Sequence, residues 1–276
     1  MDRYATAEYG RAALGIIAWT APIIDLPGTR RYRAKEMPIT SPIGHADPAS
    51  GRVLASPSPL RRYYEALFAA HGPQRWWPGR TAFEIIIGAI LTQNTSWSNV
   101  EIALRNLRRE RLLTPRGIEG VSFARLARLI RSSGYFRQKA KKLKCFVRFL
   151  QKEYHGSLNR MFRTPTAALR EKLLAVHGIG PETADSILLY AGKRPVFVVD
   201  AYTRRMLARH GVIGPTQTYE EIRELFESSL PGDAPLYNEF HALIVRTGKE
   251  YCRPHNPRCS ECPLHAFLPH AIQASL

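Results

Sequence analysis

Two glycines separated by a single residue stand between apolar segments and form a candidate anion site. Gly178 and Gly180 flank Ile179, and Pro181 follows at the first position of an expected helix. Glycine adopts left-handed backbone angles readily, so two helices can be joined here by a very tight turn with Ile179 in the core. Backbone N–H groups at the start of the second helix could then approach an anion closely. Gly178 alone would suggest an ordinary helix C-cap, but the full spacing in a basic chain favours a phosphate-binding turn.

Asp200 is a second candidate for chemistry. It follows an apolar run, Val196–Val199, and precedes a helical pattern that contains Arg204 and Arg205. A carboxylate at the start of a helix is favoured in its ionised form, because the helix dipole is positive there. Taken alone, an aspartate at such a place is commonly just an N-cap.

Aromatic and sulfur-bearing residues supply two further candidates. A Gln-Arg-Trp-Trp-Pro-Gly loop carries Trp76 and Trp77, which can form a packing corner or offer an indole face to a cation. Three of the four cysteines cluster as Cys252, Cys259 and Cys262. Four cysteines are too few for a disulfide scaffold, so the cluster is typical of a metal site in a reducing compartment.

The charge of the chain indicates a polyanionic partner. Its 276 residues carry 40 Lys+Arg against 23 Asp+Glu, a net charge of +17. The segment from Arg105 to Arg148 contains 14 basic residues and only two acidic ones, Glu110 and Glu119. Solvated helix surfaces normally mix both charges, so a phosphate-binding surface explains this segment better. No apolar run reaches the roughly 20 residues of a membrane span, and no signal-peptide cleavage pattern follows the N-terminus. We expect a cytoplasmic protein.

The elements that must position these residues are expected to be helices. Apolar residues recur at helical spacing from Leu60 to a stop at Gly72, and Phe83–Leu91 is apolar nearly all round, as in a buried helix. Thr218 and Glu221 form a capping box for a helix ending near Ser229. The only β-like run, Val196–Val199, is short, so the fold class is predicted to be all-α.

Several segments together resemble one protein family. LLAVHGIGPETADSILLYA resembles the helix-hairpin-helix of the endonuclease III superfamily of DNA glycosylases, and VFVVDAYTRR resembles its catalytic-aspartate segment. GAILTQNTSW, SGYFRQKAKKLK and GKEYCRPHNPRCSECPL match in the same order, over roughly residues 60–265. The tryptophan pair and the form of the hairpin resemble the endonuclease-III-related branch that includes 3-methyladenine DNA glycosylases.

The resemblance implies a role for each candidate. Asp200 would stabilise the oxocarbenium-like sugar as the base departs, or activate the attacking water. Gln93 would fill the hole left by a flipped base, with a helix C-terminal cap as the alternative. The base pocket would be lined by Glu182, Trp76, Trp77 and Lys249. DNA would be contacted by Gln93 and by the hairpin and basic residues Gly178, Ile179, Gly180, Thr183 and Lys139.

Glu182 decides the expected reaction type. Bifunctional members carry a lysine at this hairpin position, and its amine attacks C1′ to form a Schiff base. A carboxylate cannot form that imine, so the resemblance implies a monofunctional glycosylase without AP lyase activity. Glu182 would also suit the first turn of a helix on electrostatic grounds alone. Together with two indoles it favours cationic alkylated purines over oxidised pyrimidines or mismatched bases.

The cysteine spacing matches three of the four ligands of the family's [4Fe-4S] site. Leu268 stands where the fourth cysteine belongs, and such clusters normally need four thiolates. The three retained cysteines favour a cluster with altered ligation, while zinc with a histidine and a decayed site stay open as alternatives.

Two other functions stay open beside the monofunctional glycosylase. One is a bifunctional glycosylase and AP lyase acting on oxidised pyrimidines through another lysine, Lys249 or Lys193. The other is a non-catalytic DNA-binding protein that keeps only the hairpin and the basic surface. The expected partner is double-stranded DNA that contains a damaged base, bound by a monomer associated with the nucleoid.

The resemblance also implies two helical domains with a cleft between them. We expect a helical barrel over 83–205, with the hairpin at about 167–191. Residues 59–82 plus 206–268 would form the second domain, which ends in the cysteine loop. Residues 1–58 are expected to be a poorly ordered arm.

Overall fold

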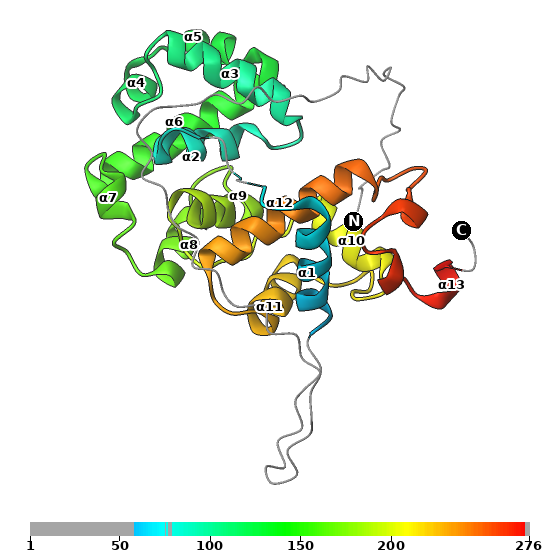
Figure 1. The fold of residues 1–276 in the computed structure, drawn as a ribbon. Coiled ribbons are helices and arrows are strands. Elements are labelled where there is room, and N and C mark those ends of the chain that lie inside the picture. Colours follow the sequence, from blue (N-terminus) through cyan, green and yellow to red (C-terminus); the bar gives the residue numbers. More distant parts are fainter. Residues whose placement is uncertain (1–57, 75, 77–78, 274–276) are drawn as a thin grey trace, which may run out of the picture. The chain divides into compact units, whose positions relative to one another are not determined.

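The computed structural model describes residues 58–74, 76 and 79–273 (Figure 1). All of them belong to one compact unit that spans Leu54–Leu276. The predicted N-terminal arm, apart from Ser58, and Trp77 of the predicted base pocket lie outside the described residues. In the described part of the chain no helix is both long and apolar enough to cross a membrane.

Helices make up all the regular structure of the described residues, which confirms the all-α prediction. They are α1 (Pro59–His71), α2 (Ala82–Leu91), α3 (Trp97–Arg109), α4 (Pro115–Gly120), α5 (Phe123–Leu129), α6 (Phe136–Tyr154), α7 (Leu158–Met161), α8 (Thr166–Leu174), α9 (Pro181–Ser186), α10 (Ala201–Arg209), α11 (Tyr219–Ser229), α12 (Ala234–Glu250) and α13 (His270–Gln273). Short 3-10 turns η1 (Arg131–Ser133), η3 (Cys259–Glu261) and η4 (His265–Phe267) and one π-helical turn, η2 (Ile187–Ala191), complete them.

Local sequence explains several of these boundaries. The apolar run predicted as a buried helix is α2, whose residues are all buried from Phe83 to Leu91. At the end of α1, Gly72 adopts φ +63°, a conformation that favours glycine. The predicted capping box is present at the start of α11, where the side chains of Thr218 and Glu221 bond reciprocally to backbone N–H groups.

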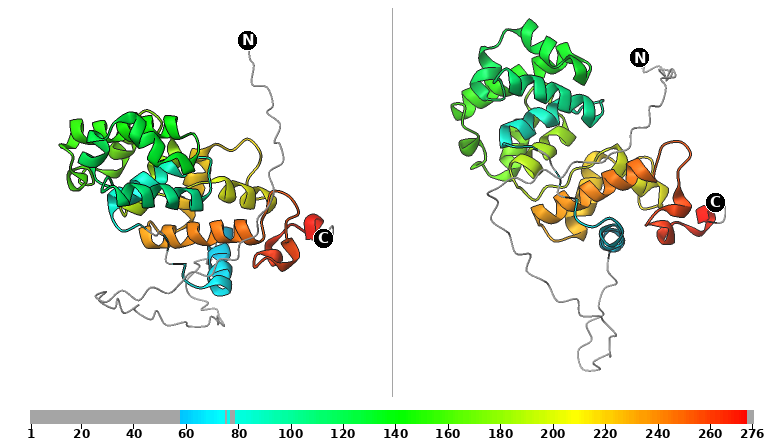
Figure 2. Two further views of the ribbon diagram at one scale, coloured as in Figure 1. Left: turned by 90° about the horizontal axis from the view of Figure 1, so that it is seen from above. Right: turned by 45° about the horizontal axis from the view of Figure 1, so that its top comes forward.

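Two hydrophobic cores organise the helices. The first is built mainly from α2 to α6, α8 and α9, and the second from α1, α10, α11 and α12. Figures 1 and 2 show α3 to α6 gathered on one side and α1, α10, α11 and α12 on the other. The predicted domain boundaries follow a similar division, although their assignment stays a prediction.

The π-helical turn η2 contributes to both cores. Ile187 and Leu188 belong to the first core, whereas Leu189 and Tyr190 belong to the second. A π turn inserts one residue into a helix and rotates the residues after it, and such turns are frequent at functional sites. The turn packs against both α2 and α12, so the hairpin helix α9 leads directly to the junction of the two cores.

Close packing of α10 on α12 brings their side chains together. A Cβ at Gly248 of α12 would come within 2.9 Å of the Tyr202 side chain of α10. Only a glycine therefore permits this approach. The irregular segment Val196–Val199 is buried and leads to the start of α10.

Candidate active site

The glycine turn between α8 and α9 has the conformation expected from its sequence. Gly178 adopts φ +85°, and Ile179 is 4% exposed in the first core. Gly180 is extended, with φ −95°, and a Cβ there would meet nothing within 4 Å. At Gly178 a Cβ would instead lie 2.7 Å from Cδ of Lys142, because the stem of that lysine crosses the turn.

An ion pair behind the turn fixes the two hairpin helices relative to each other. Arg170 of α8 donates from Nε to Asp185 Oδ1 of α9 at 2.7 Å and from Nη2 to Oδ2 at 3.0 Å. The same guanidinium reaches Glu220 of α11 at 2.7 Å. Since the Asp185 side chain is fully buried, this bidentate pair is a structural brace between the two helices.

Gln93 and Lys142 meet at the other side of the turn. Nε2 of Gln93 donates to the carbonyl of Gly178 at 3.1 Å and to Oγ1 of Thr183 at 2.8 Å. Lys142 donates from Nζ to Oε1 of Gln93. Three residues predicted to contact DNA are thus joined, and the lysine that completes the group was not expected from sequence.

Asp200 is the N-cap of α10. Its Oδ1 accepts hydrogen bonds from the backbone N–H of Thr203 at 2.8 Å and from the Thr203 hydroxyl at 2.9 Å. Its Oδ2 points toward His241 of α12, with Nε2 of that ring at 3.5 Å. Burial by itself would raise the pKa of Asp200, but His241 and the two Thr203 donors outweigh it and bring the pKa below its ordinary value. The site therefore favours a carboxylate.

His241 and Tyr190 extend this arrangement into the protein. The hydroxyl of Tyr190 lies 2.6 Å from Nδ1 of His241, and both side chains are buried. The pKa of Tyr190 is raised well above its ordinary value by burial and by the charges of Asp200 and Glu182. Neither His241 nor Tyr190 was expected from sequence, because each occurs within a run of apolar residues that indicates only core.

Glu182 and Lys249 complete the group around Asp200. Desolvation raises the pKa of Glu182, and the charge on Asp200 raises it further. Desolvation lowers the pKa of Lys249, while Asp200 acts in the opposite direction. Nζ of Lys249 lies 5.8 Å from the ring centroid of Trp76, in a cation–π contact. Two acids, one amine and one indole from separate segments are therefore brought together.

The chain matches a known family over the region that holds the hairpin and Asp200. The matching description is HhH-GPD superfamily base excision DNA repair protein, and it covers residues 87–231. The chain belongs to this superfamily. In this HhH-GPD protein the helix-hairpin-helix comprises α8, the glycine turn and α9.

Individual relatives support the same assignment. A protein of Methanocaldococcus jannaschii named as a DNA repair glycosylase is 48% identical over 210 residues, which is 75% of this chain and 94% of the relative. The H. pylori 3-methyladenine DNA glycosylase, solved with 1,N6-ethenoadenine, superposes with a TM-score of 0.62 at 31% identity and covers 69% of this chain and 97% of its own. A non-covalent endonuclease III–DNA complex, at 22% identity and a TM-score of 0.67 over 78% of this chain and 96% of its own, shares the fold.

One predicted DNA contact of this HhH-GPD protein needs correction. Lys139 is 2% exposed, and its ammonium donates to the carbonyls of Leu91, at 2.9 Å, and Ser133. Burial lowers its pKa to about 8. The side chain joins α6 to the ends of α2 and η1 and presents no surface to a phosphate. Lys142, one turn along α6, is the lysine that reaches the hairpin.

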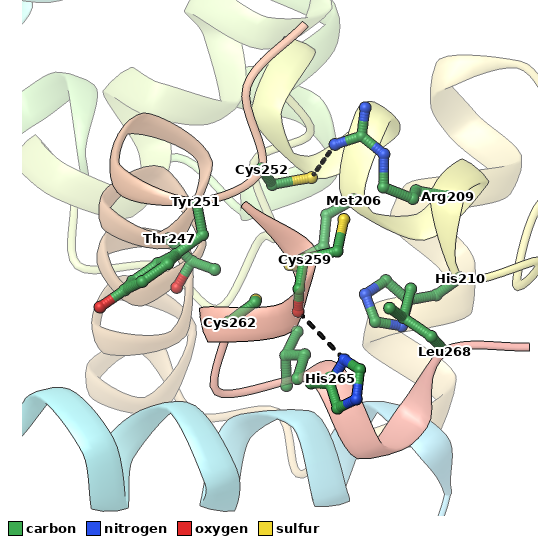
Figure 3. Close-up of a pocket in the computed structure, with 11 residues that line it drawn as sticks. Met206, Arg209, His210, Thr247, Tyr251, Cys252, Cys259, Cys262, His265 and Leu268 are labelled. Carbon is green, nitrogen blue, oxygen red and sulfur yellow. Dashed lines mark hydrogen bonds between the residues drawn. The ribbon is translucent and has the colours of Figure 1, made fainter. Parts of the chain in front are cut away.

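The cysteine loop does not have the arrangement of a metal centre. Cys252, Cys259 and Cys262 line a pocket with His265 and Leu268, and the leucine stands where a fourth ligand belongs (Figure 3). No group of three or more metal-binding side chains converges among the described residues.

Two contacts engage groups that a metal would need. Arg209 donates from Nη1 to Sγ of Cys252 at 2.9 Å, and Nδ1 of His265 lies 3.2 Å from the Cys259 carbonyl oxygen. A guanidinium thus takes the place beside one sulfur, and the histidine ring is engaged with the backbone. These residues do not fit a [4Fe-4S] cluster, and the expectation of a cluster with altered ligation is not supported.

Proposed function

We propose that this HhH-GPD protein is a monofunctional DNA glycosylase that hydrolyses the N-glycosidic bond of a flipped, damaged base, with alkylated purines as its preferred substrates. The observation that carries the proposal is the Asp200 carboxylate, held at the start of α10 beside Glu182 and Lys249, whose ammonium contacts the Trp76 ring. A protein that only binds DNA has no need of an ionised carboxylate at this place.

The proposed reaction needs few groups. As the C1′–N bond breaks, its electron pair leaves with the base and positive charge develops on the deoxyribose, where the Asp200 carboxylate stabilises it. Water then adds to C1′ and gives up one proton, for which the same carboxylate is the nearest base. A base that is already cationic departs as a neutral molecule. It therefore needs no acid to protonate it.

The preference for alkylated purines rests on Trp76 and Glu182. An indole face and a carboxylate both attract a cationic ring, and a flipped base is commonly read by stacking. The pKa of Glu182 is raised by desolvation and by the neighbouring charge of Asp200, so its negative charge lacks sufficient compensation. A cationic base would supply that compensation. The H. pylori relative, a 3-methyladenine glycosylase, has a name consistent with this class.

Hydrolysis without strand cleavage is proposed because the hairpin residue is Glu182, which has no amine. Lys249 supports the alternative of a bifunctional enzyme, since its amine is close enough to Asp200 to feel its charge and its pKa is lowered by desolvation. Lys193, by contrast, is exposed and follows η2 by two residues. Lys249 is thus the residue to test.

We propose that the DNA backbone is held at the turn between α8 and α9. A side chain at Gly180 would meet no other atoms, so the backbone there is open to a phosphate. The Lys142 ammonium is bonded to Gln93, which in turn donates to the carbonyl of Gly178. Gln93 would leave the hairpin to occupy the space of the flipped base, while Thr183 and Ile179 keep the turn in place. Lys142 would contribute a phosphate contact.

Base release and covalent trapping together test the proposal. The purified protein should release 3-methyladenine or another alkylpurine from methylated DNA, measured by mass spectrometry of the free bases, and should release less from oxidised DNA. Borohydride with abasic duplex should give no covalent adduct. A trapped adduct that disappears in Lys249→Met would establish the bifunctional alternative, whereas no base release from either DNA would contradict the proposal.

A further inference from the structure

The carboxylate proposed for catalysis has its two oxygens held by different partners. Oδ1 of Asp200 is committed to the helix cap through both donors of Thr203. Oδ2 is the oxygen left for the substrate, and the only side chain of the described residues paired with it is His241, whose Nε2 lies 3.5 Å away. This separation is longer than a normal hydrogen bond, and catalytic contacts of this kind commonly shorten when substrate binds.

The hydrogen-bond directions along the chain of side chains can be deduced. An ionised carboxylate can only accept, so a hydrogen bond between Asp200 Oδ2 and Nε2 of His241 requires the proton of a neutral ring to be on Nε2. The Tyr190 hydroxyl proton is then available to Nδ1 of His241, 2.6 Å away. A neutral imidazole that accepts at Nδ1 carries its proton on Nε2, which faces Asp200.

We propose that His241 is a positioning residue for glycosidic bond cleavage, which orients Oδ2 of Asp200 and holds it as a carboxylate by donating from Nε2, and that Tyr190 fixes the tautomer this requires. The inference rests on the proposed catalytic role of Asp200.

The surroundings of the ring favour this role over simple packing. His241 is 5% exposed and lies among aromatic side chains, with the Phe197 ring centroid 6.3 Å away. A buried imidazole would be a costly choice for filling such a space if its nitrogens had no task, because burying unpaired polar atoms is unfavourable. Nδ1 is paired with Tyr190, and Nε2, which has no hydrogen-bond partner within normal distance among the described residues, faces Oδ2 of Asp200.

Several titratable groups face Asp200, and a pH experiment must account for all of them. They lie on α9, η2, α10 and α12: Glu182, Tyr190, Tyr202, His241 and Lys249. Glu182 also titrates in acid. The informative quantity is therefore the difference between variants, all of which retain Glu182, in the pH at which activity is lost. Removing the donor at His241 raises the pKa of Asp200, so activity should be lost at a higher pH than in wild type.

The first test uses the free protein and is independent of catalysis. In ¹⁵N-histidine-labelled protein, identified by the signal missing in His241→Gln, the ring should carry its proton on Nε2 when neutral. Tyr190→Phe should lose this single tautomer, while Tyr237→Phe, which changes another buried tyrosine on α12, should keep it. A proton on Nδ1 in wild type would overturn the proposal.

The second test reads the function under single-turnover conditions on methylated DNA. His241→Phe should lower the rate roughly 10- to 100-fold, and its activity should be lost at a pH about one to two units higher on the acid side of the pH–rate profile (the acid limb). His241→Gln retains an N–H donor and should keep the acid limb of wild type. An acid limb unchanged from wild type in both His241→Phe and Tyr190→Phe would refute the inference. If His241→Phe fails to fold, an unchanged acid limb in Tyr190→Phe alone would refute it. If wild type releases no base, the proposed function fails, but the tautomer still tests the pairing.

Discussion

Replacing Gly178 by alanine should damage both the stability of the protein and its hold on DNA. The residue adopts φ +85°, and an added Cβ would collide with the stem of Lys142, at 2.7 Å from Cδ and 2.8 Å from Cε. The lysine must move, and its ammonium must then leave Gln93. The substitution therefore strains the backbone and dismantles the polar group on the turn.

The size of the effect can be worked out from these two losses. A non-glycine residue in left-handed backbone costs about 1–2 kcal/mol, and a lost side-chain hydrogen bond about 1 kcal/mol. Their sum, about 2–3 kcal/mol, should lower Tm by about 4–12 °C for a unit of this size. Loss of one lysine–phosphate contact should also reduce the slope of log Kd against log salt by about 0.9.

Gly180→Ala is the matched control, because it adds the same methyl group two residues away. Gly180 has φ −95° and free space at the Cβ position, so its replacement should change stability by less than about 1 kcal/mol. It should still weaken binding to undamaged duplex, since the methyl stands where the proposed phosphate approaches. Thermal unfolding and fluorescence anisotropy at several salt concentrations measure both quantities. Equal Tm values for the two variants would refute the reasoning.

Three further predictions concern buried or perturbed charges. Arg170→Leu leaves the fully buried Asp185 without its partner and should cost about 3–5 kcal/mol in thermal unfolding; a loss under about 1 kcal/mol would count against the brace. Lys139→Met should destabilise the fold by about 1–3 kcal/mol but leave the salt slope of DNA binding unchanged, whereas a slope reduced by about 0.9 would restore its role as a phosphate contact. The pKa of Glu182 is raised above 4.5, so its charge is lost in milder acid than usual, and the affinity for DNA with a cationic base should fall as pH drops through that range. Glu182→Gln should remove this pH dependence, and a dependence that persists would assign it to another group.

Features that depend on local sequence were predictable. The turn at Gly178 and Gly180 and the cap at Asp200 both arise within a few residues, so spacing alone indicates their backbone. The buried helix α2 is equally local, since its apolar residues cover every face. The prediction that Lys139 contacts DNA is wrong, and the helical phase of α6 gives the reason. Lys139 precedes Leu143 by four residues and Phe146 by seven, and so lies on the buried stripe of α6.

Features that depend on packing across the two cores were not predictable. Tyr190 reaches His241 because η2 packs on α12, and Asp200 faces the same ring because Gly248 allows α10 and α12 to approach closely. The periodicity of neither helix indicates this contact. The cysteine loop differs, because its sequence alone carried the relevant sign. Three cysteines at the family spacing suggested a cluster, but Leu268 at the fourth position already indicated an incomplete ligand set, and Leu268 lines the same pocket as the cysteines.

The most direct test of the central claim compares base release by Asp200→Asn and Asp233→Asn. Both aspartates are helix N-caps that accept a backbone N–H through Oδ1, from Thr203 at 2.8 Å and from Leu236 at 2.7 Å, but only Asp200 stands beside Glu182 and His241. In single-turnover release of alkylpurine from methylated DNA, Asp200→Asn should lose at least about 100-fold in rate, and Asp233→Asn should match wild type. Full activity in Asp200→Asn would contradict the claim that this carboxylate breaks the glycosidic bond.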